Sequence, residues 1–226
     1  MTEIHSPRVA VLRGRRTSWV GIGGVIGFAG IFALVRARRS EAFDVAWMLK
    51  LQRRDHPLLQ RVMRAASWPG FPPQSRIIPP AIIGGLVLAR LPLEAGFQVA
   101  AWGSALISTV MKSVMRRPRP VADERLRVVA ASLGGSSFPS GHVLTYMGVY
   151  GFLAYLAHTL IRPAAFRRAI VATLLGLVAA VGPSRIHQGH HWPTDVTASY
   201  LLGSAYLAGL TTLYRRVKAR RAGVRE

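Results

Sequence analysis

The chain has 226 residues, half of them hydrophobic, with a mean hydropathy of +0.27 and no cysteine, so it is long enough for one domain and too apolar for an ordinary soluble protein. A formal net charge of +21 would indicate a nucleic-acid partner in a soluble protein. Here, however, arginines gather at the ends of apolar stretches and in the terminal segments, as interfacial anchors and anionic-lipid contacts do. We therefore expect a membrane protein whose partners are lipid headgroups and not nucleic acid.

Six apolar stretches are candidates for membrane-spanning helices, because a hydrocarbon core of about 30 Å takes about 20 helical residues. Four are free of charge: 19–35, 95–111, 143–161 and 196–214. Two are weaker: 77–89 contains two prolines, and 166–181 begins with two arginines, so both need tilt or protein neighbours. The first stretch is expected to be an uncleaved anchor, because arginines and not a small-residue cleavage site follow it.

The region after the first stretch has the pattern of helices that lie in the membrane interface. Apolar side chains recur at helical spacing on two faces: Phe43, Ala46, Trp47 and Leu51, then Leu58, Val62 and Ala66. Proline and glycine predict loops at 68–73 and 134–137. The sequence thus predicts an all-α polytopic membrane bundle of six transmembrane helices plus interfacial amphipathic helices. Its domain is 18–214, between basic tails at 1–17 and 215–226.

An even number of spans returns both tails to one side of the membrane. The same count places three polar clusters together on the other side, because they follow the third span, precede the fourth and join the fifth to the sixth. Arginine and lysine occur on both faces, so the positive-inside rule leaves the orientation open.

The first polar cluster extends from Lys112 to Arg119 and Pro120. Lys112 falls in the last turn of the third span, and Pro118 disfavours helix at Arg117, so Arg119 is expected in an extended loop. The side chains of Lys112 and Arg119 are then expected to approach one point from different directions. Arg116 and Arg117 are interpreted as headgroup contacts.

The second cluster, Pro139-Ser140-Gly141-His142, immediately precedes an apolar run. The backbone N–H groups of Ser140, Gly141 and His142 are therefore expected to be the unpaired donors of a helix start. Such a terminus binds phosphate well.

In the third cluster, Ser184-Arg185 is followed by His191 and, one helical turn later, Asp195, with Pro193 acceptable in the first turn of the sixth helix. Asp195 can hold one imidazole nitrogen and leave the other free to attack phosphorus, which is the logic of an oriented nucleophile. Only spacing distinguishes His191 from His190 in this role.

A metal site is an alternative interpretation of three neighbouring histidines, His187, His190 and His191. The carboxylate-rich shell of metallophosphatases is missing, since the carboxylates near the clusters are Asp123, Glu124 and Asp195. Fixed cations would then neutralise phosphate charge instead of a metal. We expect no metal and no cofactor.

The three clusters together resemble the motifs of the type 2 phosphatidic acid phosphatase superfamily, which includes lipid phosphate phosphatases and vanadium haloperoxidases. Their patterns are K-x6-RP, PSGH and SR-x5-H-x3-D. All three motifs are present in order between Lys112 and Asp195. The resemblance implies that His191 is the nucleophile and that His142 is the general acid and then the base that activates water. It implies the following phosphate ligands: Lys112, Arg119, Ser140, Gly141 and Arg185.

The expected function is a membrane phosphatase that hydrolyses lipid phosphates or polyprenyl diphosphates through a phosphohistidine, without a metal. Phosphatidate, phosphatidylglycerol phosphate and undecaprenyl diphosphate are not distinguished as substrates. Transfer of a phosphoryl group or headgroup to a lipid acceptor, and a non-catalytic role in lipid binding or transport, remain alternatives; haloperoxidase activity is not expected. By resemblance to bacterial membrane relatives, both tails would lie in the cytoplasm and the site would face outward.

Overall fold

The computed structural model describes residues 7–53, 56–120, 125–127 and 134–221, with side chains from residue 17 onward. Within these ranges the regular secondary structure is entirely helical, which confirms the all-α fold class. The helices, in chain order, are α1 Pro7–Arg36, α2 Glu41–Gln52, α3 Pro57–Ser67, the 3-10 turn η2 Trp68–Gly70, α4 Gln74–Leu88, α5 Pro92–Trp102, α6 Ser104–Met115, α7 Gly141–Leu160, α8 Ala164–His187 and α9 Pro193–Arg221.

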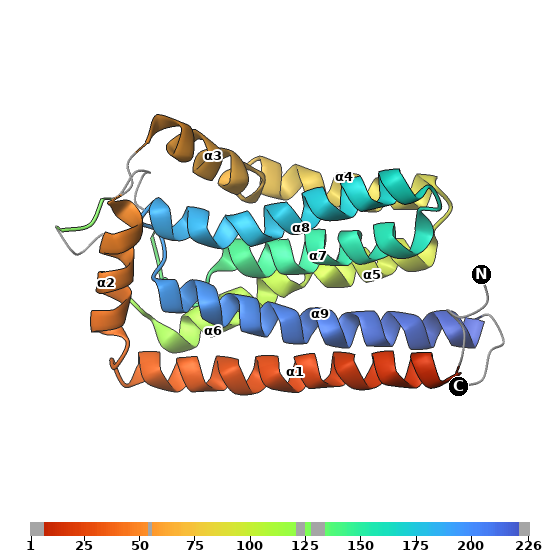
Figure 1. The fold of residues 1–226 in the computed structure, drawn as a ribbon, viewed down its shortest axis with the longest axis horizontal. Coiled ribbons are helices and arrows are strands. Elements are labelled where there is room, and N and C mark those ends of the chain that lie inside the picture. The colour runs from red at the N-terminus through yellow and green to blue at the C-terminus, as the bar shows by residue number, and fades with distance from the viewer. Residues whose placement is uncertain (1–6, 54–55, 121–124, 128–133, 222–226) are drawn as a thin grey trace.

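The long helices run roughly parallel to one axis (Figure 1). Helix α1 packs along α9, and α7 packs against both α8 and α9. Helix α2 crosses one end of this bundle, whereas the start of α1 and the end of α9 lie at the opposite end. The molecule therefore has two distinct ends.

Among the described residues, three helices are long and apolar enough to cross a membrane: Thr17–Arg36, Gly141–Leu160 and Ala164–His187. The expected stretches 77–89, 95–111 and 196–214 coincide with α4, with α5 and α6, and with α9. A membrane-spanning bundle is thus supported, and the count of six spans stays a prediction.

The stretch 95–111, expected to be one span, consists instead of two helices that meet at Gly103. Glycine is a poor helix former, so it tolerates the break. The hydroxyl of Tyr206 on α9 donates a hydrogen bond to the carbonyl of Ala100, one of the groups that a helix end leaves without a partner. The apolar pattern continues through the break and therefore does not reveal it.

The segments expected as tails are partly helical. Helix α1 begins at Pro7, and α9 continues to Arg221, well beyond the expected last span residue at position 214. Arginine, lysine and alanine are good helix formers, and no proline or glycine interrupts 215–221, so α9 continues after its apolar run has ended.

Helices α2 and α3 have the predicted exposed faces in large part. Phe43 and Trp47 on α2 and Leu58 and Val62 on α3 are exposed, as expected for helices that lie at a lipid interface, whereas Ala66, expected on the same face of α3, is buried. The opposite face of α2 buries a polar residue, Asp44, which is fully buried.

Helix α7 is the central element of the bundle, because 67% of its apolar window is buried, against 11% for α1 and for α8. Val143, Tyr146, Val149 and Phe152 are all fully buried along its length. The apolar surfaces of α1 and α8 remain outside, where a bilayer would cover them. This arrangement fixes the start of α7, and with it His142, in the interior of one end of the bundle.

Candidate functional site

The three polar clusters meet at the ends of four helices. Lys112 lies in the last turn of α6, His142 in the first turn of α7, Arg185 in the last turn of α8 and Asp195 in the first turn of α9. All four ends lie at the α2 end of the bundle (Figure 1). Helix α8 extends through Pro183 to His187, beyond the expected end at position 181, and this extension carries Arg185.

Hydrogen bonds tie the clusters to one another. Arg119 donates through Nη1 to the carbonyl of His190 at 2.8 Å, which joins the first cluster to the third. The Ser137 backbone N–H donates to the carbonyl of Arg117 at 2.9 Å, and its hydroxyl donates to that of Pro118 at 3.0 Å, which joins the second cluster to the first. Arg119 lies in the extended segment after α6, as predicted.

The imidazole of His191 is held by a backbone group. Its Nδ1 lies 2.7 Å from the carbonyl oxygen of Ser137. Because a carbonyl oxygen only accepts, Nδ1 carries the proton and the lone pair of Nε2 is free. Burial lowers the pKa of His191 well below its ordinary value of 6.5, and the cations of Arg185, Arg119 and Lys112 lower it further. The Ser137 hydrogen bond raises this pKa by a smaller amount. We therefore expect His191 to be neutral at neutral pH, with the Nε2 lone pair available.

Asp195 is close to His191 but does not hold it through a direct hydrogen bond, in contrast to the expectation from sequence. The distance from Asp195 Oδ2 to His191 Nδ1 is 3.7 Å. The carboxylate instead accepts hydrogen bonds from the Trp192 backbone N–H at 2.9 Å and from Arg117 Nη1 at 2.6 Å. The Ser137 carbonyl takes the expected position beside the ring, and sequence spacing gives no signal for such a backbone group.

Arg117 is a largely buried link between two carboxylates and not a headgroup contact as expected. Its Nη1 pairs with Asp195 and its Nη2 pairs with Asp44, each at 2.6 Å. Asp44 also accepts hydrogen bonds from the backbone N–H and the hydroxyl of Thr194, at 2.9 and 2.8 Å. One side chain of α2 thus holds both the start of α9 and the arginine that contacts Asp195. No motif in the sequence marks Asp44.

Arg185 presents part of its guanidinium without a partner. Its Nη1 donates to Ser67 at 3.2 Å and to Gln188 at 3.3 Å, which orients the group. Among the described residues, its buried Nε and Nη2 have no hydrogen-bond partner. The same holds for Arg119 Nε, the Ser140 hydroxyl and His142 Nε2. Buried polar groups normally have partners, so this group of donors is suited to an anion.

The start of α7 agrees with the predicted anion site in part. The backbone N–H of Ser140 donates to the hydroxyl of Ser199 at 2.7 Å, so it is not the available donor that the sequence suggested. The N–H groups of Gly141 and His142 lie in the first turn, where helices leave donors unpaired. A Cβ on Gly141 would lie 3.6 Å from Lys112 Nζ, which brings the first two clusters together.

His142 is enclosed by the connection between α3 and α4, which sequence reasoning treated only as a loop. A Cβ on Gly70 would lie 2.2 Å from His142 Cδ2, so the glycine backbone packs directly on the imidazole. The ring of Phe71 packs edge-on against His142, with 4.8 Å between the ring centroids. The Arg185 guanidinium lies 4.8 Å from the centroid of the Phe71 ring. The proline and glycine content predicted the turn, but nothing in it predicted this contact.

His190 and His187 differ from His191 in having no fixed partner. Their ring nitrogens are buried without a hydrogen bond to any described residue, and His190 packs edge-on against Phe71. The described part of the chain contains no group of three histidine or acidic residues placed to hold a metal ion. Asp123 and Glu124 lie outside the described residues. Orientation by Ser137 therefore favours His191 over His190 as the reacting imidazole.

Three comparisons with known proteins found similar sequences and folds. Residues 94–219 match the model of the PAP2 superfamily. Phosphatidylglycerophosphatase B of Bacillus subtilis (strain 168) is 29% identical over 151 residues, which cover 65% of this chain and 71% of that protein. The crystal structure of a transmembrane PAP2 type phosphatidylglycerolphosphate phosphatase from Bacillus subtilis matches with a TM-score of 0.77 and 21% identity, covering 88% of this chain and 98% of the other. LpxE of Aquifex aeolicus matches with a TM-score of 0.59 and 19% identity, covering 75% of this chain and 95% of that one.

Proposed function

Because the chain belongs to the PAP2 superfamily, we propose that it is a membrane phosphatase that hydrolyses lipid phosphate esters or diphosphates through a phosphohistidine on His191. The observation that carries this proposal is the state of His191. Its Nδ1–H is tied to the Ser137 carbonyl, and its unprotonated Nε2 lies within the field of three cations. A neutral, oriented imidazole beside an anion site is the arrangement that nucleophilic attack on phosphorus requires.

In the first step, Nε2 of His191 attacks the phosphorus, and the bond from phosphorus to the leaving oxygen breaks. A proton from His142 passes to that oxygen, so the lipid leaves as an alcohol or, from a diphosphate, as a monophosphate. Lys112, Arg119 and Arg185 neutralise the phosphoryl oxygens throughout, which takes the place of metal-ion catalysis. The available donors of Arg185 and Arg119 support this assignment.

In the second step, a water molecule attacks the phosphohistidine while His142, now neutral, accepts its proton. The bond from phosphorus to Nε2 breaks, and inorganic phosphate leaves. The role of Asp195 in this scheme is electrostatic. Its carboxylate lies 3.7 Å from Nδ1 of His191 and balances the charge that His191 acquires when it is phosphorylated.

A lipid substrate is supported by the position of the site and by the relatives. The site lies at one end of a bundle whose outer helices expose apolar side chains, so a substrate could keep its chains in the bilayer and its headgroup at the helix ends. Two of the matched proteins carry names that specify phosphatidylglycerophosphate phosphatase activity. We propose a lipid phosphate of this class and a site on the extracytoplasmic face.

The test is phosphate release by the purified chain in detergent with EDTA, with phosphatidate, phosphatidylglycerol phosphate and undecaprenyl diphosphate as substrates. Replacement His191→Ala should lower turnover by about four orders of magnitude or more, as removal of other nucleophiles does. Substrate labelled in the phosphoryl group should leave acid-labile label on the unsubstituted protein and none on this variant.

The matched control is His190→Ala, which removes the neighbouring imidazole that has no hydrogen-bond partner among the described residues. It should keep the phosphoenzyme. If His190→Ala loses the label instead, or if His191→Ala retains full activity, the nucleophile is misassigned.

Addition of a lipid alcohol separates hydrolysis from transfer, because a transferase would form a new phosphate ester in place of inorganic phosphate.

A further inference from the structure

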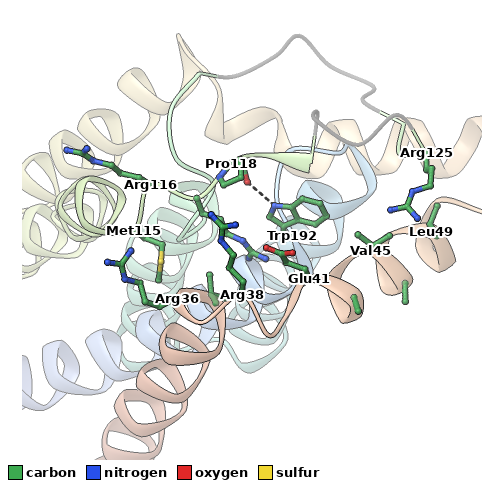
Figure 2. A pocket seen from close by; sticks show the side chains of 14 residues that line it. Arg36, Arg38, Glu41, Val45, Leu49, Met115, Arg116, Pro118, Arg125 and Trp192 are labelled. Atoms are coloured by element: carbon green, nitrogen blue, oxygen red, sulfur yellow. Dashed lines mark hydrogen bonds between the residues drawn. The ribbon is translucent and has the colours of Figure 1, made fainter.

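A groove with a volume of about 960 Å³ lies beside the catalytic cluster, where α1 turns into α2 (Figure 2). None of the proposed catalytic or phosphate-binding residues lines it. Its apolar wall comes from α1, α2 and α6 and consists of Val35, Ala42, Val45, Ala46, Leu49 and Met115. Arg117 and Trp192 close the side that faces the catalytic cluster. The groove is therefore a separate concavity that shares only a wall with the site.

The charge of this groove is strongly positive, since five arginines and one glutamate line it. Figure 2 shows Arg36 and Arg116 toward one end and Arg125 toward the other, with Trp192 between them. The indole of Trp192 is fixed by a 2.9 Å hydrogen bond to the Pro118 carbonyl. A ligand that carries both a negative group and an apolar part fits a groove that is basic and apolar in this way.

Three of the lining arginines are available for such a ligand. Arg36, Arg38 and Arg116 are exposed, and their guanidinium groups make no hydrogen bond or ion pair with any described residue. Arg117, by contrast, is occupied by Asp44 and Asp195. The groove thus combines one arginine with a structural role and three unpaired arginines.

Two of these arginines can be replaced without backbone strain. Arg38 and Arg116 follow the ends of α1 and α6 with positive φ angles of 57° and 47°. Glycine is the usual residue at such left-handed helix ends, because a side chain there is disfavoured. Glycine at both positions therefore removes the two guanidinium groups and leaves the backbone unstrained.

The surroundings of the mouth suit a lipid. Helices α1 and α6 carry cations near their ends, Arg36 and Lys112. Near the same ends they expose apolar side chains: Leu34 of α1 is 48% exposed and Val114 of α6 is 55% exposed. A lipid with its phosphate among the arginines can place its acyl chains on this apolar surface.

We propose that this groove binds the phosphate headgroup of an anionic phospholipid of the surrounding membrane, at a site separate from the catalytic centre. The ligand class is a phosphodiester lipid such as phosphatidylglycerol, which is held through its charge and is not hydrolysed. This site does not depend on the proposed function, because none of its free arginines belongs to the catalytic machinery.

The test uses native mass spectrometry of the full chain in detergent, titrated with phosphatidylglycerol or with phosphatidylcholine that carries the same acyl chains. The unsubstituted protein should bind phosphatidylglycerol more tightly. In the double variant Arg38→Gly with Arg116→Gly, affinity for phosphatidylglycerol should fall by about fivefold for each arginine removed. Because glycine suits the left-handed backbone, the midpoint of thermal unfolding should stay the same or rise.

Two control variants separate this site from general surface charge. Arg90→Gly replaces the other described arginine with a positive φ angle, 59°, in the connection between α4 and α5 at the opposite end of the bundle. Arg39→Gln changes an exposed arginine in the same turn that does not line the groove. Both should bind phosphatidylglycerol as the unsubstituted protein does.

Equal affinity for the two lipids, unchanged binding by the double variant, or an equal loss in Arg90→Gly would each overturn the proposal. Displacement of the lipid by millimolar inorganic phosphate would show a site for free anions only and would also overturn it. If the double variant fails to fold, Arg36→Gln provides the same test, because Arg36 is the last residue of α1 and has ordinary helical geometry.

Discussion

The imidazole of His142 contacts a glycine and an aromatic ring that lie far from it in the sequence. A Cβ on Gly70 would come within 2.2 Å of the ring, and Phe71 packs edge-on against it. In the proposed mechanism His142 is the proton donor, and such a group must be placed to within a fraction of an ångström, so we expect these contacts to matter for turnover and not only for packing.

The replacement Gly70→Ala should therefore displace His142 and lower kcat by about a hundredfold, with a smaller change in KM. Gly70 has no positive φ angle, so the added methyl group acts through the clash and not through backbone strain. The control is Gly134→Ala, where a Cβ meets nothing within 4 Å. Steady-state kinetics of both variants give the comparison, and equal activity of the two would show that His142 tolerates displacement.

The lowered pKa of His191 gives a second expectation at this scale. The folded protein holds this imidazole neutral, so the folded state binds fewer protons than the unfolded chain below pH 6.5. The contribution of His191 to stability is accordingly present above its ordinary pKa and is lost as the pH falls toward the folded pKa. An NMR titration of labelled histidine, with the signal assigned through His191→Asn, should find its midpoint well below the ordinary histidine value of 6.5. A midpoint at or above 6.5 would contradict the expectation.

A buried carboxylate of helix α2 contacts the candidate site. Asp44 pairs with Arg117 and accepts two hydrogen bonds from Thr194 at the start of α9, the helix that carries Asp195. A buried ion pair of this kind is costly to break, because the remaining charge has no compensation. The interfacial helix is thus part of the framework of the site and not only a cover for the end of the bundle.

Replacement Asp44→Asn should destabilise the fold by about 3 kcal/mol, since it leaves Arg117 buried with one carboxylate in place of two. Glu41→Gln is the matched control, because it removes an acidic group one turn earlier on the exposed face of α2. Thermal unfolding in detergent measures both. A shift for Asp44→Asn no larger than that for Glu41→Gln would mean that the buried pair contributes little.

The molecule as a whole has one end that carries the candidate catalytic site, called the catalytic end, which is formed by helix termini and crossed by α2. At the opposite end α9 finishes at Arg221. Arginines occur at both ends, so charge does not orient the bundle in a membrane. We expect the catalytic end to face outward, as the family resemblance implies.

Cysteine labelling tests this orientation, because the chain has no cysteine of its own and the unsubstituted protein is a blank control. Gly134→Cys introduces a thiol at an exposed loop of the catalytic end, and Arg221→Cys introduces one at the other. A membrane-impermeant maleimide should label the first in intact cells and the second only after permeabilisation. The reverse pattern would place the catalytic end inside.

The sequence by itself determined the all-α class, the apolar stretches and the residues of the three clusters. These features are local: an apolar run, a proline or a helix start acts over a few residues, so Lys112, His142 and Asp195 lie at helix ends as predicted. The family followed from the order and spacing of the same motifs.

Only the tertiary structure decided which groups complete the site. The Ser137 carbonyl, Asp44 and Gly70 come from other segments and carry no motif, because a backbone oxygen, a buried carboxylate and a glycine acquire their roles from what packs against them. Packing also gave Arg117 a structural role and broke the expected third span at Gly103. Long-range contacts depend on how the helices cross, and local sequence patterns do not contain that information.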